Sequence, residues 1–406
     1  MRLASSKASS FPLLSSHVWV PVPIRVVFSM LSGFLKLSRR VSIRKTPMGR
    51  RNYALNAEKM NHPERILVTG SLGQIGAELT LMLSGRGHSV LATDVRPPPA
   101  ELAHKFGSAI GFRYLDVSSD SDIRRLVVEH RIDSIIHLSA KLSATAERDP
   151  GGAFGVNTRG VENVLEIGRQ YGLKVYAPSS IAAFGPATPN LDKMVADVTI
   201  QRPLNVYGVA KLYLETLGEW YNYRYGLDFR SLRYPGILSS DTLPGGGTTD
   251  YAIEIFYAAL LDGYHSAPFT ATSRSYTCGV GPTRRLPMMY MPDCLKATID
   301  IFEADPANLK LRTYNVAAMS FTPDEIVAAL NRAIKTENEK LPIKAKPLEI
   351  NYKLDIRDQI ASTWPAALDD TNARKDWSWR HSYDIDALAR DMLHKISNRL
   401  VNHPAH

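Results

Sequence analysis

A short apolar run that leads into three closely spaced glycines constrains the fold of this chain more than any other feature. Residues 65–69 read as a buried strand, and Gly70, Gly73 and Gly76 follow at once. Glycines at this spacing permit a tight turn and a close approach of the backbone to a pyrophosphate, which the amides at the start of the next helix face. An apolar stripe predicts that helix over about residues 74–86. The pattern indicates a dinucleotide-binding unit, and the alternative is a simple turn between strand and helix.

An acidic residue follows the second predicted strand. Residues 89–93 are apolar and end at Asp94, which lies 18 residues after Gly76. A carboxylate at this place accepts hydrogen bonds from ribose hydroxyls and repels a 2′-phosphate. The cofactor is therefore expected to be NAD rather than NADP, although Arg96 lies close by in the sequence and weakens the inference.

Strands and helices continue to alternate along the chain. Further strands are predicted at residues 112–115, 134–138 and 175–178, with helices at 121–130 and 150–171 between them. This alternation predicts an α/β fold with a Rossmann-type, doubly wound parallel sheet. Ligands of such sheets bind beyond the carboxyl ends of the strands. Residues expected at that edge are Gly70, Asp94, Asp116, Ala140 and Ser180.

Tyr207 and Lys211 are the candidate catalytic pair. They stand four residues apart, which places both side chains on one face of a helix. A neighbouring ammonium favours the phenolate, so Lys211 is expected to lower the pKa of Tyr207 and allow it to take a proton from an alcohol. Ser180, at the end of the fifth strand, is the third candidate and would hold the substrate oxygen. Taken singly, Ser180 also fits a turn cap and Lys211 a solvated charge.

This constellation resembles the extended short-chain dehydrogenase/reductase family. The matching residues are Thr69-Gly70-x-x-Gly73-x-x-Gly76, Asp94, Asp116-Val117, Ser179-Ser180 and Tyr207-x-x-x-Lys211. The resemblance covers about residues 64–395 and implies a Rossmann domain followed by a smaller C-terminal α/β substrate domain. We expect an NAD-binding domain over residues 58–235, with later segments returning to it, a mainly substrate-binding domain over 236–395, and a tail over 396–406.

The resemblance also implies which residues hold NAD. The expected cofactor-binding set is Gly70, Gly73, Gln74, Ile75, Gly76, Asp94, Asp116, Val117, Leu138, Ala140, Asn157, Tyr207, Lys211 and Tyr234.

Longer matches resemble the L-threonine 3-dehydrogenases within this family. They are residues 178–185, 233–237, 244–251, 286–291, 362–365 and 368–377. This resemblance implies oxidation of L-threonine to L-2-amino-3-oxobutyrate with reduction of NAD⁺, in threonine catabolism to glycine. Thr248 and Thr249, before a helix expected near Asp250, are predicted to bind the substrate with Ser143, Ser180 and Tyr207; capping of that helix is the alternative for the two threonines. Trp364 is expected either to cover the site or to be a buried structural residue.

Two features depart from the threonine dehydrogenase pattern. The catalytic hydroxyl belongs to Ser180, where relatives often carry threonine, and the function is expected to survive that exchange. The segment from about Gly263 to Arg285 looks longer than in the family, with an insertion near 268–275. The insertion is either a surface loop or an error in the gene model, which leaves any role of Arg284 or Arg285 open.

The basic charge of the chain is confined to its N-terminus. The whole chain has a net charge of +9, and residues 1–57 contain ten Lys or Arg and no acid, so the remainder is close to neutral. We therefore expect no nucleic-acid partner. The basic, serine-rich segment is typical of a mitochondrial transit peptide, with a disordered tail or a mistaken start site as alternatives. No apolar run reaches the roughly 20 residues of a membrane-spanning helix, and two cysteines predict neither a disulfide framework nor a metal site.

Two other hypotheses stand beside threonine oxidation in the mitochondrial matrix. A nucleotide-sugar epimerase or dehydratase uses the same scaffold, and a catalytically silent NAD-binding subunit is a third reading. Relatives are commonly homodimers through helices that correspond here to about 150–171 and 205–224. The family's pathway also implies a functional link to a coenzyme A-dependent ligase that acts on 2-amino-3-oxobutyrate.

Overall fold

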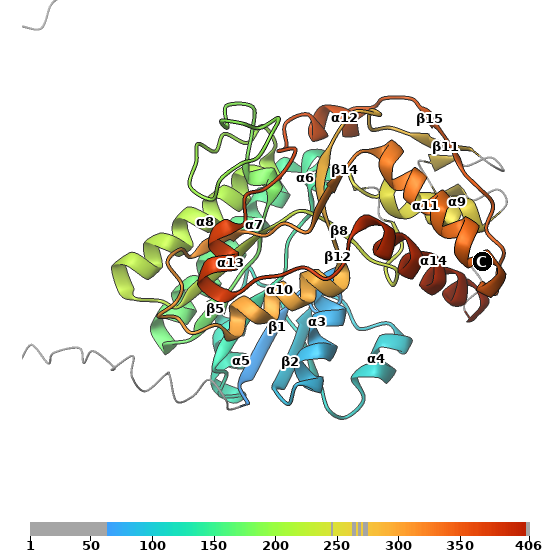
Figure 1. Cartoon of the computed structure of the whole chain (residues 1–406). Helices are drawn as coiled ribbons and strands as arrows, with labels where there is room; N and C mark the ends of the chain where they lie inside the picture. The colour runs from blue at the N-terminus through green and yellow to red at the C-terminus, as the bar shows by residue number, and fades with distance from the viewer. Residues whose placement is uncertain (1–62, 245–246, 262–264, 267–268, 271–274, 403–406) are drawn as a thin grey trace, which may run out of the picture. The chain divides into compact units, whose positions relative to one another are not determined.

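The glycine-rich unit folds as predicted in the computed structural model. Strand β1 (Arg65–Thr69) leads through the glycine loop into helix α3 (Gln74–Gly85), and β2 (Ser89–Asp94) pairs with β1 in parallel (Figure 1). The structure describes residues 63–244, 247–261, 265–266, 269–270 and 275–402. The predicted transit peptide, residues 1–57, lies outside the described residues.

The central sheet is parallel and doubly wound, which confirms the predicted fold class. Its strand order is β13-β7-β5-β4-β1-β2-β3, with β6 paired to β7. The chain builds outward from β1 to β3, then crosses to β4 on the other side of β1, so the topological switch point lies between β1 and β4. The remaining strands are β3 (Gly111–Tyr114), β4 (Ser134–His137), β5 (Lys174–Tyr176), β6 (Ser179–Ser180), β7 (Phe229–Tyr234) and β13 (Thr313–Asn315).

Helices cover both faces of this sheet. On one face α3 and α10 (Met291–Glu303) pack Leu79, Leu83 and Phe302 against the strands. On the other, α5 (Asp120–Glu129), α7 (Pro150–Tyr171) and α8 (Val206–Tyr225) form a second apolar layer. Three shorter helices complete this half: α4 (Ala100–Phe106), α6 (Ser143–Arg148) and α13 (Thr371–Trp377). The predicted helix over 150–171 has the predicted bounds.

A second, smaller set of strands and helices follows β7. Strands β8 (Gly236–Leu238), β12 (Leu286–Tyr290) and β14 (Met319–Phe321) form one sheet, and β11 (Ser275–Cys278) pairs with β15 (Glu349–Tyr352). Around them lie α9 (Tyr251–Leu260), α11 (Pro323–Glu337), α12 (Ile356–Ala361) and α14 (Ile385–Asn402). Every residue of α9 is buried, so this half has a core of its own. The segments α10, β13 and α13 return to the large sheet.

The structure bears on two expectations about the chain after residue 260, the tail and the insertion. The residues expected to form a tail from 396 onward continue α14 as far as Asn402, and Ile396 and Leu400 are buried in the core, so the tail prediction is wrong for 396–402. Within the apparent insertion, β9 (His265–Ser266) pairs with β10 (Phe269–Thr270), while the residues between and after them lie partly outside the described residues. The division at residue 235 stays a prediction.

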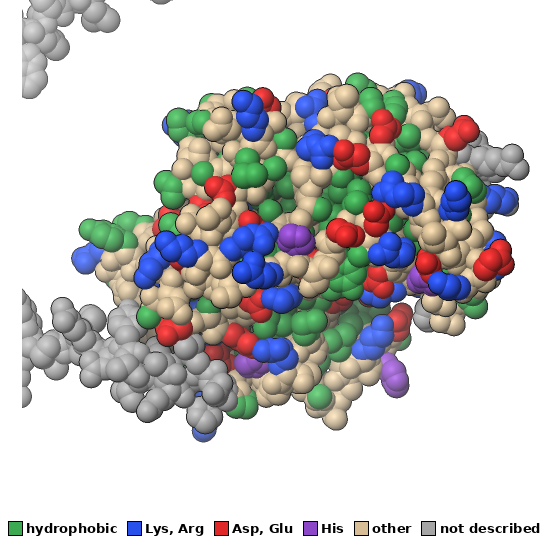
Figure 2. Space-filling view, viewed as in Figure 1, with side chains coloured by type: hydrophobic (Ala, Val, Ile, Leu, Met, Phe, Trp, Pro, Cys, Tyr) green, Lys and Arg blue, Asp and Glu red, His purple; other side chains and the backbone are tan. Residues whose placement is uncertain are grey.

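Charges on the surface are mixed. On the face drawn in Figure 2, basic and acidic side chains lie interspersed, with hydrophobic side chains between them. This agrees with the near-neutral charge that the sequence assigns to the chain after residue 57. Within the described residues, no helix combines the length and apolarity needed to cross a membrane.

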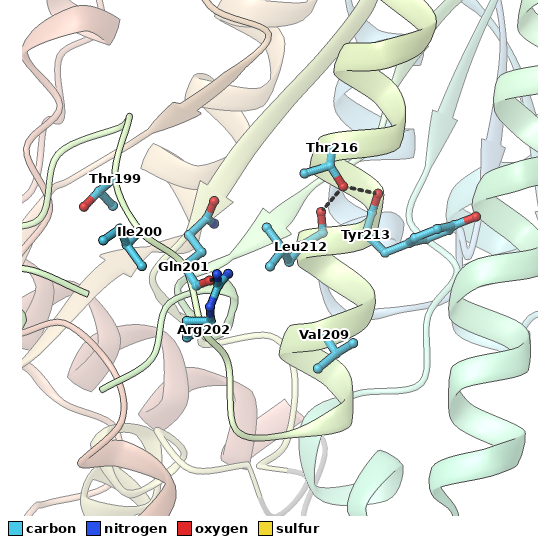
Figure 3. A pocket seen from close by; sticks show the side chains of 8 residues that line it. All are labelled: Thr199, Ile200, Gln201, Arg202, Val209, Leu212, Tyr213 and Thr216. Atoms are coloured by element: carbon cyan, nitrogen blue, oxygen red, sulfur yellow. Dashed lines mark hydrogen bonds between the residues drawn. The ribbon is translucent and has the colours of Figure 1, made fainter. Parts of the chain in front are cut away.

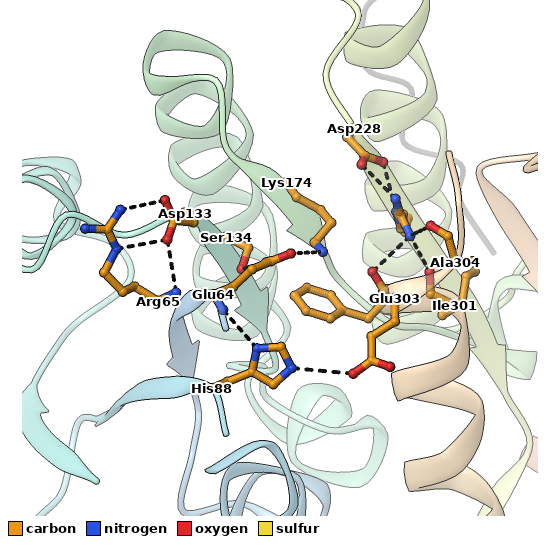
Figure 4. A network of polar contacts seen from close by, with 12 residues as sticks. Glu64, Arg65, His88, Asp133, Ser134, Lys174, Asp228, Ile301, Glu303 and Ala304 are labelled. Atoms are coloured by element: carbon orange, nitrogen blue, oxygen red, sulfur yellow. Dashed lines mark hydrogen bonds and ion pairs between the residues drawn. The ribbon is translucent and has the colours of Figure 1, made fainter. Parts of the chain in front are cut away.

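A polar network at the amino ends of the strands ties α10 to the sheet (Figure 4). Arg230, on β7, donates to the carbonyl oxygens of Ile301, Phe302 and Ala304 at 2.6–2.9 Å, and pairs with Asp228 at 2.8 Å. These bonds satisfy the carbonyl groups that every helix leaves open at its C-terminus. The network therefore stabilises the sheet edge opposite to the predicted site.

A second arm of this network depends on pH. Glu303 lies 3.4 Å from His88 and 2.6 Å from Arg86. Hydrogen bonds from His88 and Arg86, opposed by burial, lower the pKa of Glu303 to about 2. Because this pKa lies below its ordinary value near 4.5, the stabilisation is complete above that value and is lost as the pH falls towards 2.

Replacing Arg230 tests how much the first arm contributes. Arg230→Met should lower the free energy of unfolding by about 3–5 kcal/mol, because it leaves buried carbonyls and Asp228 without their donor. Arg312→Met is the matched control, since Arg312 approaches Asp228 only to 3.9 Å, and should cost under about 1 kcal/mol. Urea unfolding of both variants measures the difference, and equal losses would contradict the assignment.

Candidate active site

The glycine loop packs directly against the end of β4. Gly70 has a φ of +68°, and a Cβ there would lie 2.7 Å from the backbone nitrogen of Ser139. A Cβ on Gly76 would lie 2.2 Å from the carbonyl oxygen of Gly70. Gly73 precedes α3 and makes no side-chain capping bond to it. The loop thus leads backbone amides to the switch point with no side chain in the way, which fits a dinucleotide pyrophosphate.

The predicted edge residues gather at one side of the sheet. Asp94 ends β2, and its carboxylate accepts a hydrogen bond from the Leu72 amide at 3.2 Å, which holds it beside the glycine loop. Asp116, after β3, is exposed and accepts from the Ser118 amide, whereas Val117 is buried. Arg96 is largely exposed and comes within 3.8 Å of Asp94. The structure therefore brings these residues together as the parallel register requires.

Two expected cofactor residues use their polar groups elsewhere. Asn157 accepts from the backbone nitrogen of Lys141 at 2.8 Å and donates to its carbonyl at 3.0 Å, so it holds the loop after β4, which contains Ala140. The hydroxyl of Tyr234 bonds Tyr176 at 2.6 Å and also Thr298 in the core. The hydroxyl of Tyr234 is therefore hydrogen bonded within the core. If Tyr234 contacts a cofactor, it does so through backbone atoms.

Tyr207, Ser180 and Lys211 meet where α8 crosses the end of β6. Asn205 caps α8 by accepting from the Gly208 amide at 2.7 Å, which starts the helix just before Tyr207. The hydroxyl of Tyr207 lies close enough to that of Ser180 for Ser180 to influence its acidity. Ser180 also accepts from the Ala182 amide at 3.2 Å, so it serves as a turn cap as well. Lys211 donates to the carbonyl oxygen of Pro178 at 2.7 Å.

Gly208 makes this meeting possible. A Cβ on Gly208 would lie 2.0 Å from the carbonyl oxygen of Ala182, in the short 3₁₀ helix Ile181–Ala183 that follows Ser180. The helix backbone therefore lies directly against the turn that carries Ser180. This contact places the hydroxyl of Tyr207 beside that of Ser180.

Burial dominates the acidity of both candidate groups, Tyr207 and Lys211. Burial raises the pKa of Tyr207 to about 12, while the hydrogen bond from Ser180 opposes this. Burial lowers the pKa of Lys211 to about 8, and the Glu215 carboxylate raises it. The expectation that the pKa of Tyr207 is lowered is wrong for the protein by itself, although the Lys211 ammonium, bound to Pro178, lies 5.6 Å from the centre of the Tyr207 ring. Desolvation of the phenolate is the larger effect.

The expected substrate residues lie on two other elements. Thr248 is buried and Thr249 partly so, and a Cβ on Gly236 would lie 2.8 Å from the Thr249 side chain, which places Thr249 against β8. Helix α9 begins after Asp250, which makes no side-chain capping bond to it, and for the two threonines both substrate binding and capping stay predictions. Gly245 and Gly246 lie outside the described residues. Ser143 begins α6, whose Glu147 accepts from the Val206 amide at 2.9 Å at the start of α8.

Three residues whose roles the sequence left open have definite places. Trp364 packs, partly buried, against the apolar group of Ile181, Phe184, Val195 and Leu368 beside Ser180. Arg284 pairs with Asp358 at 3.3 Å, and Arg285 pairs with Glu325. Both arginines thus make contacts within the smaller half of the protein.

Sequence reasoning missed three residues of this site. Glu215 stands one helical turn beyond Lys211, a spacing that would have revealed it. Asn205 precedes the helix as a typical N-cap residue. His137, at the end of β4, bonds Thr69 at 2.9 Å, and burial, helped by the charge of Lys211, lowers its pKa to about 3. No local pattern distinguishes His137 from a core histidine.

Comparison with known proteins assigns the family. The model of the NAD dependent epimerase/dehydratase family matches residues 66–317. The chain belongs to this family. The bovine protein named mitochondrial L-threonine 3-dehydrogenase is 43% identical over 81% of this chain and 82% of its own length.

Solved structures agree in fold and sequence. L-threonine dehydrogenase from Phytophthora infestans is 45% identical, with a TM-score of 0.74 over 83% of this chain and all of that one. A monomeric L-threonine 3-dehydrogenase from a metagenome is 34% identical, with a TM-score of 0.71 over 82% of this chain and 99% of that one. Membership of the family and the geometry of the glycine loop make NAD the cofactor. The described residues hold no cluster of three or more metal-ligating side chains.

The Gly208 contact is testable in this epimerase/dehydratase-family protein. Gly208→Ala should lower kcat at least about 10²-fold, because the added methyl forces α8 away from the turn of Ser180 and displaces Tyr207. Gly85→Ala is the control, since a Cβ at Gly85 meets no atom within 4 Å. Steady-state kinetics of both variants, with circular dichroism to verify folding, measure the effect. A folded Gly208→Ala protein with normal kcat would contradict the contact.

Proposed function

We propose that this protein is an NAD-dependent L-threonine 3-dehydrogenase, which oxidises L-threonine to L-2-amino-3-oxobutyrate as NAD⁺ becomes NADH. The observation that carries the proposal is the meeting of Ser180 and Tyr207 hydroxyls, with Lys211 beside them, at the edge of a dinucleotide-binding sheet. Relatives named for this activity cover most of the chain and support threonine as the alcohol.

Each residue has a separate task in this reaction. Bound NAD⁺ supplies the hydride acceptor. Tyr207 takes the proton of the threonine hydroxyl, and Ser180 holds that oxygen through its own hydroxyl. Lys211 holds a positive charge beside Tyr207 and binds the nicotinamide ribose. Asp94 binds the adenosine ribose, and the amides of the glycine loop face the pyrophosphate.

The carboxylate and ammonium of threonine need a polar wall. Thr248 and Thr249 lie just before the N-terminus of α9, where a carboxylate is stabilised by backbone amides. Ser143, at the start of α6, is proposed as a further residue that binds the substrate. Trp364 covers the site from its position on the apolar group next to Ser180. In this proposal the hydroxyl groups and backbone amides of these residues bind the carboxylate and the ammonium of threonine.

The acidities of the two catalytic groups predict a pH profile. Below pH 8 the rate rises with pH, because more Tyr207 is ionised while Lys211 stays protonated. Above the Lys211 pKa of about 8 the gain in Tyr207 phenolate is cancelled by loss of the ammonium, so the rate stops rising. Two ionisations with opposite effects give such a break.

An assay of the purified protein with NAD⁺ and L-threonine tests the function. Wild type should form NADH in proportion to threonine and should prefer NAD⁺ to NADP⁺, because Asp94 repels a 2′-phosphate. Tyr207→Phe should lose at least about 10²-fold in kcat, because the base is removed, but should still bind NAD⁺. Tyr221→Phe, on the same helix with its hydroxyl 3.2 Å from Glu166, is the control and should keep full turnover.

Three results would contradict parts of this proposal. Turnover of a nucleotide sugar without any threonine-dependent NADH would favour the epimerase reading. NAD⁺ binding with no turnover of either substrate would favour a silent subunit. Substantial activity in Tyr207→Phe would remove Tyr207 as the base.

We further propose that the protein works in the mitochondrial matrix. The composition of residues 1–57 and the mitochondrial name of the bovine relative support this placement. The product is a β-keto acid that loses CO₂ readily, which favours rapid use by a coenzyme A-dependent ligase in the same compartment.

The outer side of α7 and α8 is the proposed homodimer surface. Phe154, Val209, Trp220, Tyr223 and Tyr225 present exposed hydrophobic side chains there. A groove of about 520 Å³ runs between α8 and residues 199–202 (Figure 3). Its α8 lining residues lie on the side of the helix away from Tyr207 and Lys211, so the groove is separate from the catalytic residues. A second copy of this chain is the proposed occupant.

Sedimentation velocity tests the dimer. Wild type should sediment with twice the mass of one chain, and Val209→Asp should shift it towards the monomer, because it places a charge in the apolar groove. Val128→Asp is the control on α5, where Val128 is 56% exposed against 42% for Val209. A monomeric wild type, like the monomeric relative, or a dimeric Val209→Asp would contradict the surface.

A further inference from the structure

Glu215 is a buried carboxylate one helical turn beyond Lys211. Its side chain is 3% exposed and accepts hydrogen bonds from three separate segments of the chain. Arg233, on β7, donates at 2.9 Å through Nε and 2.7 Å through Nη2. Gln201 donates at 3.0 Å from the loop before α8, and Ser179 donates from β6. The carboxylate thus joins α8 to both strands and to the loop beside them.

Two hydrogen bonds, one of them made by Glu215, tie α8 to the strand end that carries Ser180. Ser179 directly precedes Ser180, so the bond from Ser179 to Glu215 pins the strand end that carries the catalytic hydroxyl. Lys211 reaches the same strand end from α8 through Pro178. Helix and strand are therefore tied twice, by Lys211 before Ser180 and by Glu215 through Ser179.

Arg233 keeps this arrangement electrically balanced. Its remaining nitrogen donates to the carbonyl of Asp197 at 2.7 Å and to Asn315 at 3.2 Å, and its guanidinium lies 5.1 Å from the centre of the Phe184 ring. A buried pair with this many hydrogen bonds gains geometric definition, whereas removal of one partner leaves an uncompensated charge. Protein groups rather than water molecules therefore hold the Arg233–Glu215 pair in position.

From this geometry we propose that Glu215 is a positioning residue for threonine oxidation, holding Ser180 against Tyr207 and keeping Lys211 in its charged form. The inference rests on the proposed function. Glu215 does not touch the substrate oxygen or the reacting carbon; it acts through Ser179 and through Lys211.

The charges around Lys211 explain why the carboxylate matters. On α8 the ionisable neighbours are Tyr207 and Glu215. From β4 comes His137, which is neutral near pH 7 because its pKa is about 3, and from β7 comes Arg233, whose charge Glu215 compensates. Glu215 is therefore the group that opposes the lowering of the Lys211 pKa by burial.

Glu215→Gln tests the proposal, because it keeps the shape of the side chain and removes the charge. The kcat for threonine should fall at least about tenfold, with KM changed less than about threefold. The pH at which the rate stops rising should move about one unit below that of wild type, because the Lys211 ammonium is lost earlier. Glu219→Gln is the control, because Glu219 is an exposed carboxylate one turn further along α8, and it should match wild type.

Ser179→Ala isolates the geometric half of the proposal. It breaks the link to the strand end and keeps the charge, so kcat should fall about three- to tenfold with no shift of the break. If Glu215→Gln does not fold, the kcat of Ser179→Ala decides: a loss supports the proposal and a wild-type value overturns it.

Two results with folded Glu215→Gln would overturn the proposal. One is a wild-type kcat and pH profile. The other is a fall in kcat that matches the fraction of protein unable to bind NAD⁺, while the rate stops rising at the same pH as in wild type. That result would mean that Glu215 only stabilises the fold. Wild type without threonine turnover would instead overturn the proposed function, so the two failures are distinct.

Discussion

Two backbone contacts that leave no space for a side chain determine the geometry of this site. At Gly70 the loop after β1 touches the end of β4, and at Gly208 helix α8 touches the turn after Ser180. The first contact sets where a pyrophosphate can lie, and the second sets where Tyr207 can reach an alcohol. Backbone adapts less than side chains do. The backbone contacts of the sheet therefore set the distance between the cofactor site and Tyr207.

Electrostatics at the site follows from that close packing. Removing water from the Tyr207 phenol raises its pKa, and removing water from the Lys211 ammonium lowers it, so burial acts against both charged forms. Among the described residues, the carboxylate that raises the Lys211 pKa is that of Glu215, whose own charge is balanced by Arg233. The catalytic residues and the buried ion pair therefore form one unit, and a substitution in one member changes the others.

Local patterns predicted most elements of the large sheet, whereas in the smaller half they predicted only the helix that begins near Asp250. The strand and helix around Gly70 and the helix over 150–171 were predicted because period and length suffice where helices and strands alternate. The C-terminal helix was taken in part for a tail, although Ile396 and Leu400 pack into the core. Its burial depends on α9 and α11, which no local window contains.

The sequence by itself determined the chemistry available here: the phosphate-binding loop, the acid after β2, and the Tyr207 and Lys211 pair on one helix face. It could do so because these features depend on spacing within one element or between neighbours. Only the tertiary structure decided how those groups behave. Burial reversed the expected shift in the Tyr207 pKa, the core took the hydroxyl of Tyr234, and Glu215 came to bond both Ser179 and Arg233. Each of these results depends on contacts between residues far apart in the chain, and desolvation acts only once they are made.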